Sequence, residues 1–225
     1  MALDIGDTEI ITDDTEWTSS DFTLISADNV RFRVPSFFIL AAMPVFRDAG
    51  GGASVSNDKI VYFTDSSFET ASTLRTFCQL ITTARLPSWE EGEYAELSQH
   101  ITDVVTFLRK YECDAMLETF KLAFHYNYLH SADSDFSLEG LVLGSVADDL
   151  HFCIEAMYTN SWEPPTDVPH QKIMMLVPFN MPLKVHNLIP PTYLWALSSA
   201  WQNADNDMGK FRELFRSLVH HARRG

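Results

Sequence analysis

The sequence is poor in basic residues and cysteine, and it contains no long apolar run. It has 16 Lys and Arg against 31 Asp and Glu in 225 residues, so its net charge is −15. Because phosphate recognition needs clustered Lys and Arg, this balance argues against nucleic acid, and against anionic membrane surfaces, as partners. No apolar stretch approaches the ~18 residues that a membrane-spanning helix requires, and the first residues do not form a charged-then-apolar signal segment. We therefore expect an intracellular protein of the cytoplasm or nucleus.

The three cysteines, Cys78, Cys113 and Cys153, are widely spaced and lie in apolar stretches. An odd number without a Cys-x-x-Cys pair fits neither a disulfide framework nor a zinc knuckle, so we expect reduced cysteines in the core. The histidine spacings do not supply the three or four converging ligands of a zinc site. Hydrolase, kinase, phosphate-loop and dinucleotide-binding patterns are also missing. We therefore expect no metal, no cofactor and no catalysis.

The N-terminal part of the chain predicts a leader and a hairpin. Residues 1–19 are acidic and lack a periodic apolar pattern, which predicts a flexible leader in which Glu9-Ile10-Ile11 could add an edge strand. Residues 22–25 and 30–34 flank the turn-forming Ala27-Asp28-Asn29, so they predict a β-hairpin. Its inner face should carry Val30, Phe32 and Val34.

A short helix should follow at residues 36–46, shortened or kinked by Pro44, and residues 59–63 predict a third strand. Apolar spacings of three and four residues then predict helices. They cover residues 68–81, 97–111, 117–124, 138–157 (renewed after Asp148-Asp149), 193–201 and 208–219. Seven of the ten prolines lie in the segment 162–191, which therefore cannot form one continuous helix. Its residues 173–177 are too apolar for a free linker, so we expect this segment to pack on the domain.

The predicted hairpin and first helix share a sequence motif with a known family. The family motif reads Asp-apolar-x-apolar, a turn, Phe-x-apolar-His, and a helix ending apolar-Ala-x-Ser-x-x-Phe. This chain is similar to it at Asp21-Phe22-Thr23-Leu24-Ile25 and then at residues 30–48, VRFRVPSFFILAAMPVFRD. This motif opens BTB/POZ domains. Residues 68–81 and 104–113, the latter with Lys110-Tyr111, resemble the next helices of that family. Residues 138–201 resemble the helical extension of its fungal members.

The resemblance implies an α+β fold, with a BTB/POZ-like small β-sheet (the hairpin plus the third strand) flanked by a cluster of helices. An α-helical C-terminal extension would follow. The implied limits are a flexible acidic leader at 1–19, a BTB/POZ domain at 20–128, and a helical extension at 129–225 that includes the proline-rich segment 162–191.

Three positions depart from the family motif. Pro35 stands where the family has His, Ser36 where a basic residue usually follows, and Met43 where Ser is usual. In dimeric transcription-factor members, the counterpart of Asp21 and that basic residue line a charged pocket at the dimer interface. Here the acid stands without its basic partner.

The resemblance implies a protein–protein interaction module without catalysis, which forms a homodimer and recruits a protein partner. A substrate adaptor of a cullin-type ubiquitin ligase is the alternative, although no MATH, Kelch or zinc-finger module is visible. A third hypothesis, from a different class, is an unrecognised enzyme in which His151 and Glu155 meet His125 in a cleft. His151 and Glu155 are four residues apart and would share a helix face.

Five residues are candidates for partner binding, namely Asp21, Phe37, Phe38, Phe46 and Trp89. Phe37 and Phe38 are consecutive, so both cannot face one side of a helix, and we expect at least one to pack on the domain. Trp89 lies in the loop-like stretch LPSWEE, where it either anchors a partner or folds back onto the core. The apolar face of the last predicted helix either docks on the extension or fills a groove of a partner.

Overall fold

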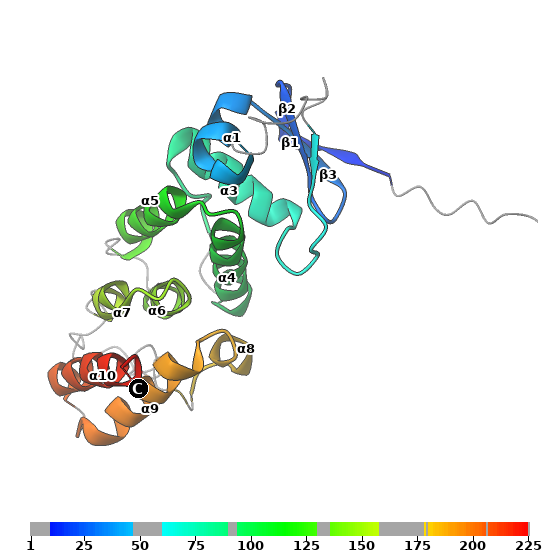
Figure 1. The fold of residues 1–225 in the computed structure, drawn as a ribbon. Helices are drawn as coiled ribbons and strands as arrows, with labels where there is room; N and C mark the ends of the chain where they lie inside the picture. Colours follow the sequence, from blue (N-terminus) through cyan, green and yellow to red (C-terminus); the bar gives the residue numbers. More distant parts are fainter. Residues whose placement is uncertain are drawn as a thin grey trace, which may run out of the picture. The chain divides into compact units, whose positions relative to one another are not determined.

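The structure is a computed structural model, which describes residues 10–46, 60–89, 94–129, 136–157, 178, 180–205 and 207–224. It is a mixed α+β structure that combines one four-stranded sheet with a series of helices (Figure 1). The chain divides into two compact units. Unit 1 comprises Met1–Arg85 and Thr106–Glu118, and unit 2 comprises Leu86–Val105 and Thr119–Gly225. The domain limits of 20–128 and 129–225 stay a prediction.

The sheet of unit 1 has the predicted hairpin at its centre. Its strands are β1 (Thr12–Thr18), β2 (Phe22–Ile25), β3 (Val30–Val34) and β4 (Ile60–Tyr62), in the order β1-β3-β2-β4. β2 and β3 are antiparallel, whereas β1 pairs with β3, and β4 with β2, in parallel. Asn29 closes the hairpin turn with a positive φ of 62°, a conformation that Asn tolerates better than most residues. The expected inner face is confirmed for Phe32 and Val34, which are buried, while Val30 is half-buried.

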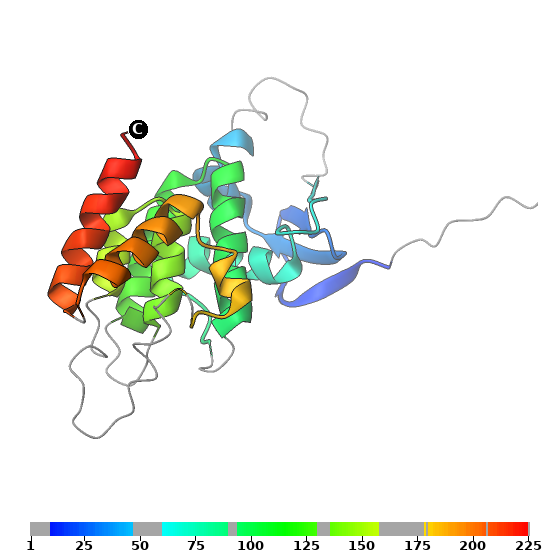
Figure 2. The ribbon, with the colours of Figure 1, turned by 90° about the horizontal axis from the view of Figure 1, so that it is seen from below.

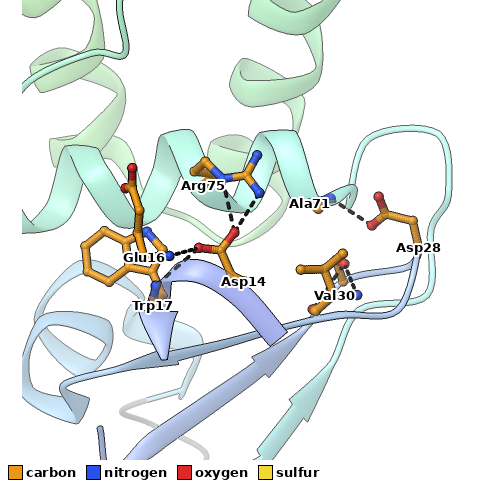
Figure 3. A network of polar contacts seen from close by, with 8 residues as sticks. Asp14, Glu16, Trp17, Asp28, Val30, Ala71 and Arg75 are labelled. Atoms are coloured by element: carbon orange, nitrogen blue, oxygen red, sulfur yellow. Dashed lines mark hydrogen bonds and ion pairs between the residues drawn. The ribbon is translucent and has the colours of Figure 1, made fainter. Parts of the chain in front are cut away.

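The edge strand differs from the prediction of a flexible leader with a strand at Glu9-Ile10-Ile11. It lies later, at Thr12–Thr18, and within it Asp14 is buried although the neighbouring side chains are mostly exposed. The Asp14 carboxylate accepts hydrogen bonds from Arg75 Nε (3.1 Å) and Nη2 (2.6 Å) on α3 (Ala71–Thr83) and from the backbone N–H groups of Glu16 and Trp17 (Figure 3). The strand therefore depends on backbone pairing and one distant ion pair, which an apolar pattern does not reveal.

Two helices that follow the hairpin in sequence, α1 (Ser36–Ala42) and α3, contact each other within unit 1 (Figure 1). α1 ends as expected before Pro44, because the residue that precedes a proline is driven out of the helical region; Met43 has φ −117° and ψ 90°. α3 buries Leu74, Phe77 and Cys78. The ring of Phe107 lies 5.2 Å from that of Phe77, so aromatic packing forms part of this core.

Most of the remaining helices confirm the predicted apolar spacings, but two short ones, at His125–Leu129 and Leu183–His186, were not predicted. The remaining helices are α4 (Tyr94–Lys110), α5 (Asp114–Phe124), the π-helix η1 (His125–Leu129), α6 (Ser137–Val146), α7 (Leu150–Ala156), α8 (Leu183–His186), α9 (Pro191–Asn203) and α10 (Met208–Ala222). In unit 2, α10 packs on α9 and α7 (Figure 2). Its Phe211, Phe215 and Val219 are fully buried, so this helix docks on its own unit, which was one of the two alternatives.

Helix α6 is the central helix of unit 2, since every residue from Ser137 to Ser145 is buried. It packs on α7, where a Cβ on Gly144 would lie 2.7 Å from both the backbone nitrogen and the Sγ of Cys153. Asp149 caps α7 by accepting a hydrogen bond from the Phe152 N–H at 3.0 Å. A glycine at position 144 therefore permits the close approach of the two helices.

All three cysteines are free and buried, as predicted. Burial raises the pKa of the Cys113 thiol to about 12, and it raises those of Cys78 and Cys153 as well. Among the described helices, none combines the length and apolar character needed to cross a bilayer. The glycine run at 50–52 and the apolar residues 173–177 lie outside the described residues.

Candidate protein-interaction surface

The start of α1 is held by Asp21, one of the five candidate residues. Its Oδ1 accepts a hydrogen bond from the Ser36 N–H at 2.8 Å, and its Oδ2 accepts one from the Ser36 hydroxyl at 2.7 Å. A carboxylate at a helix N-terminus satisfies a free N–H group and interacts favourably with the helix dipole. Asp21 is exposed, but its carboxylate is partnered within the chain by the residue that replaces the basic residue of the family motif.

A second aspartate of the hairpin acts in the same way on α3. Asp28, in the turn between β2 and β3, accepts a hydrogen bond from the Ala71 N–H at 2.8 Å (Figure 3). The N-cap residue of α3, Thr70, makes no side-chain cap of its own. Aspartates of the hairpin therefore hydrogen-bond to the first turns of both α1 and α3.

The exposed side of α1 carries two adjacent aromatic rings. Phe37 is 63% exposed, and its ring centroid lies 4.0 Å from that of Phe38, which is half-buried. Ile39 and Ala42 face the core instead, as the spacing of consecutive helical residues requires. The helix sequence SFFILAA contains no charged residue, although 21% of the chain is charged. We call Phe37, Phe38 and the exposed Ala41 the aromatic face of α1.

Phe46, another candidate, lies half-buried within unit 1. Its ring centroid is 5.8 Å from that of Tyr111 and 6.5 Å from that of Phe22. These contacts connect the segment after α1 to β2 and to the residues that follow α4. Phe46 is thus a packing residue in this structure, and its role in partner binding stays a prediction.

A buried polar network beside these rings was not predicted. Glu69 is 1% exposed, and its carboxylate accepts hydrogen bonds from the N–H groups of Thr64 and Asp65 and, at 2.6 Å each, from Lys110 Nζ and the Tyr111 hydroxyl. Burial alone would raise the pKa of Glu69, but these hydrogen bonds together lower it. Burial and the Glu69 carboxylate raise the pKa of Tyr111. The sequence drew attention to Lys110-Tyr111 through the family resemblance, but it gave no indication that Glu69 is their buried partner.

Trp89 lies in unit 2, where it packs on aromatic neighbours. Its ring stacks on Tyr128, with centroids 5.0 Å apart and an interplanar angle of 21°, and Tyr128 donates a 2.5 Å hydrogen bond to the carbonyl of Pro87. The ring of His100 lies edge-on to Trp89 at 5.9 Å. Burial lowers the pKa of His100 to about 4. Trp89 is therefore half-buried by folding back onto its own unit, the second of the two alternatives.

The three residues of the enzyme hypothesis do come together in unit 2. Glu155 Oε2 lies 3.6 Å from His125 Nδ1, and Glu155 Oε1 lies 3.4 Å from His151 Nδ1. The His151 side chain is 77% exposed, against 28% for His125 and 40% for Glu155, so the His151–Glu155 pair lies near high-dielectric solvent and gains little from its surroundings. A cavity of about 230 Å³ in unit 2 is lined by other residues, which are Pro178, His186, Ser198, Trp201 and Gln202.

Metal binding finds no support in the described residues, among which no group of three or more His, Cys, Asp or Glu side chains is placed to hold an ion. Comparison with known protein families yields no matching family model, and a search of curated proteins yields no match. Any functional assignment therefore depends on the geometry of the chain itself, in which the aromatic face of α1 combines an exposed aromatic ring with a helix that has no charged residue.

Proposed function

We propose that this chain is a protein-interaction module of BTB/POZ type, without catalysis, which self-associates through the aromatic face of α1. The observation that carries the proposal is the exposure of Phe37 beside Phe38 on a helix that contains no charge. The order of the elements supports it as well, because a hairpin, a short helix, a strand and then consecutive helices follow one another as the resemblance implies. This order is compatible with the family but not specific to it.

The electrostatics of the chain favour this surface for contact between copies. Two chains that each carry a charge of −15 repel one another, so a contact is least costly where both surfaces are uncharged. α1 meets this requirement, and Asp21, at its N-terminus, already bonds to Ser36. Burying a Phe side chain in an interface stabilises it by about 1.5–3 kcal/mol. A two-fold contact uses the same patch twice and so gains this contribution from both copies of Phe37.

The test compares two variants that add one negative charge at an exposed apolar residue. Phe37→Asp alters the aromatic face, whereas Leu122→Asp, at a residue that is 70% exposed on α5 in unit 2, is the matched control. Mass is measured by light scattering after size exclusion, from low to high micromolar concentration. We expect wild type and Leu122→Asp to be dimers and Phe37→Asp to be a monomer with an unchanged far-UV circular dichroism spectrum.

Two outcomes would contradict the proposal. The first is a wild-type chain that remains monomeric at high micromolar concentration. The second is a dimer that survives in folded Phe37→Asp, which would place the contact elsewhere. Phe38 is less suitable as a probe because it is half-buried, so that its substitution changes packing as well as the surface.

A further inference from the structure

The positive charge of this acidic chain is concentrated at one helix of unit 2. Residues 208–224, which contain α10, hold five of the 16 Lys and Arg but only one of the 31 acidic residues, Glu213. The same segment adds His220 and His221. Elsewhere acids outnumber bases, so this segment carries charge of the opposite sign to the rest of the chain.

The apolar face of α10 is buried in unit 2, whereas most of its basic residues are exposed; Arg212 is half-buried. Arg216, His220 and Arg224 are exposed and lie four residues apart, with Arg224 just beyond the end of the helix. Along a helix, this spacing covers about 12 Å. We call these three residues the basic end of α10.

Contacts within the chain account for two other bases of this segment but not for the basic end. Arg223 pairs with Asp148 at 2.5 Å and contacts the Tyr193 hydroxyl, and Lys210 pairs with Asp205. Within the described residues, the side chains of Arg216, His220 and Arg224 have no ion pair or hydrogen bond. The helix dipole favours cations only in the last turn, and Arg216 lies before it.

We propose that the basic end of α10 is a docking site for a short acidic peptide segment of a protein partner. Charge complementarity is the argument: guanidinium groups bind carboxylates with paired hydrogen bonds, and two guanidinium groups with an imidazole between them, within about 12 Å, match a few acidic residues of an extended peptide. A long nucleic acid would also meet the acidic remainder of the chain, which repels it. A bilayer would require an apolar face for insertion, and that of α10 is already buried.

The test uses the full chain and a fluorescein-labelled hexaglutamate peptide, followed by fluorescence anisotropy at low ionic strength. The variant Arg216→Gln/Arg224→Gln removes two charges from the basic end. The control Arg85→Gln/Arg109→Gln removes two charges at exposed arginines elsewhere. We expect affinity to fall about tenfold in the first and to stay within about twofold in the second, since two exposed ion pairs contribute about 1.4 kcal/mol together. Raising the salt concentration should weaken binding of the wild type.

Three outcomes would overturn the proposal. One is the absence of hexaglutamate binding, and another is an equal loss in both double variants, which would mean a response to net charge alone. The third is tighter binding of an oligo-dT of equal charge, or of phosphatidylserine vesicles, than of the peptide. Unchanged circular dichroism spectra of both variants separate a lost contact from a lost fold. The result is independent of α1, so the self-association experiment and this one can fail separately.

Discussion

The half-buried imidazole of His100 predicts a loss of stability in mild acid. Burial lowers its pKa from 6.5 to about 4 in the folded chain, where its ring lies edge-on to Trp89. Between these two pH values the unfolded chain binds a proton at this residue and the folded chain does not. Stability therefore rises with pH in this window and is lost as the pH falls from 6.5 towards 4. Between pH 7 and pH 4.5 the loss amounts to roughly 2 kcal/mol.

Urea unfolding at pH 7, 6, 5 and 4.5, followed by tryptophan fluorescence, measures this loss. The variant His100→Gln cannot titrate, so its free energy of unfolding should fall by roughly 2 kcal/mol less than that of the wild type over the same range. Burial raises the pKa of Asp103, which acts with the opposite sign, but this residue is present in both proteins and cancels in the comparison. Equal losses in the two proteins would show that burial does not keep the imidazole neutral, and the reasoning would fail.

Two further substitutions test contacts described above. Gly144→Ala should lower the free energy of unfolding, measured in urea, by about 1–3 kcal/mol, because its Cβ would lie 2.7 Å from the backbone nitrogen of Cys153. Gly209→Ala, in the first turn of α10, would place its Cβ 3.2 Å from a side-chain oxygen and should be neutral or stabilising. Asp14→Asn should cost about 1.5–3 kcal/mol at pH 7, since it removes the charged partner of Arg75. Burial alone would raise the pKa of Asp14, but its hydrogen bonds outweigh burial and lower it. The wild type should therefore lose its advantage over Asp14→Asn as the pH falls below about 4, and thermal melting at pH 7 and pH 3 should show the stabilities of the two proteins converging. A constant difference would contradict this reasoning.

Periodic patterns in the sequence were sufficient to predict the hairpin and most helices. Apolar and basic residues alternate at 30–34, and the turn ends at Asn29, which tolerates a positive φ. Both features are local in the sequence, so they were sufficient to predict β2 and β3. The spacings of α3 and α10 are equally local. Such patterns succeed where a single face of each element is buried.

Pairings between distant residues were not predictable from those patterns. β1 is stabilised by Asp14 and Arg75, which are 61 residues apart, and its acidic sequence is otherwise typical of a flexible leader. Glu69 is buried because Lys110 and Tyr111 meet it from 41 and 42 residues away. Because the chain has 31 acidic residues, the sequence alone does not identify Asp14 and Glu69 as the two that form these buried contacts.

The surroundings of the candidate residues were only partly predictable, and their role in partner binding stays a prediction. Phe37 is exposed and Phe38 is half-buried, so one of the two packs partly on the domain as expected, although their rings lie 4.0 Å apart on the same side of α1. Asp21 was expected to lack a basic partner; in the structure Ser36 donates two hydrogen bonds to it, through its backbone N–H and its hydroxyl. Trp89 had two alternatives, and the choice between them depended on Tyr128, which is 39 residues away in the sequence.

The burial of every thiol makes this chain a convenient background for covalent probes. Thiolates are the reacting species, and burial that raises the pKa of Cys78, Cys113 and Cys153 keeps them protonated and shielded from reagents. A cysteine introduced at an exposed position would then be the fastest site for a maleimide dye or a spin label, with no need to replace the native residues first. Distances between labelled copies could be measured in the otherwise unaltered protein.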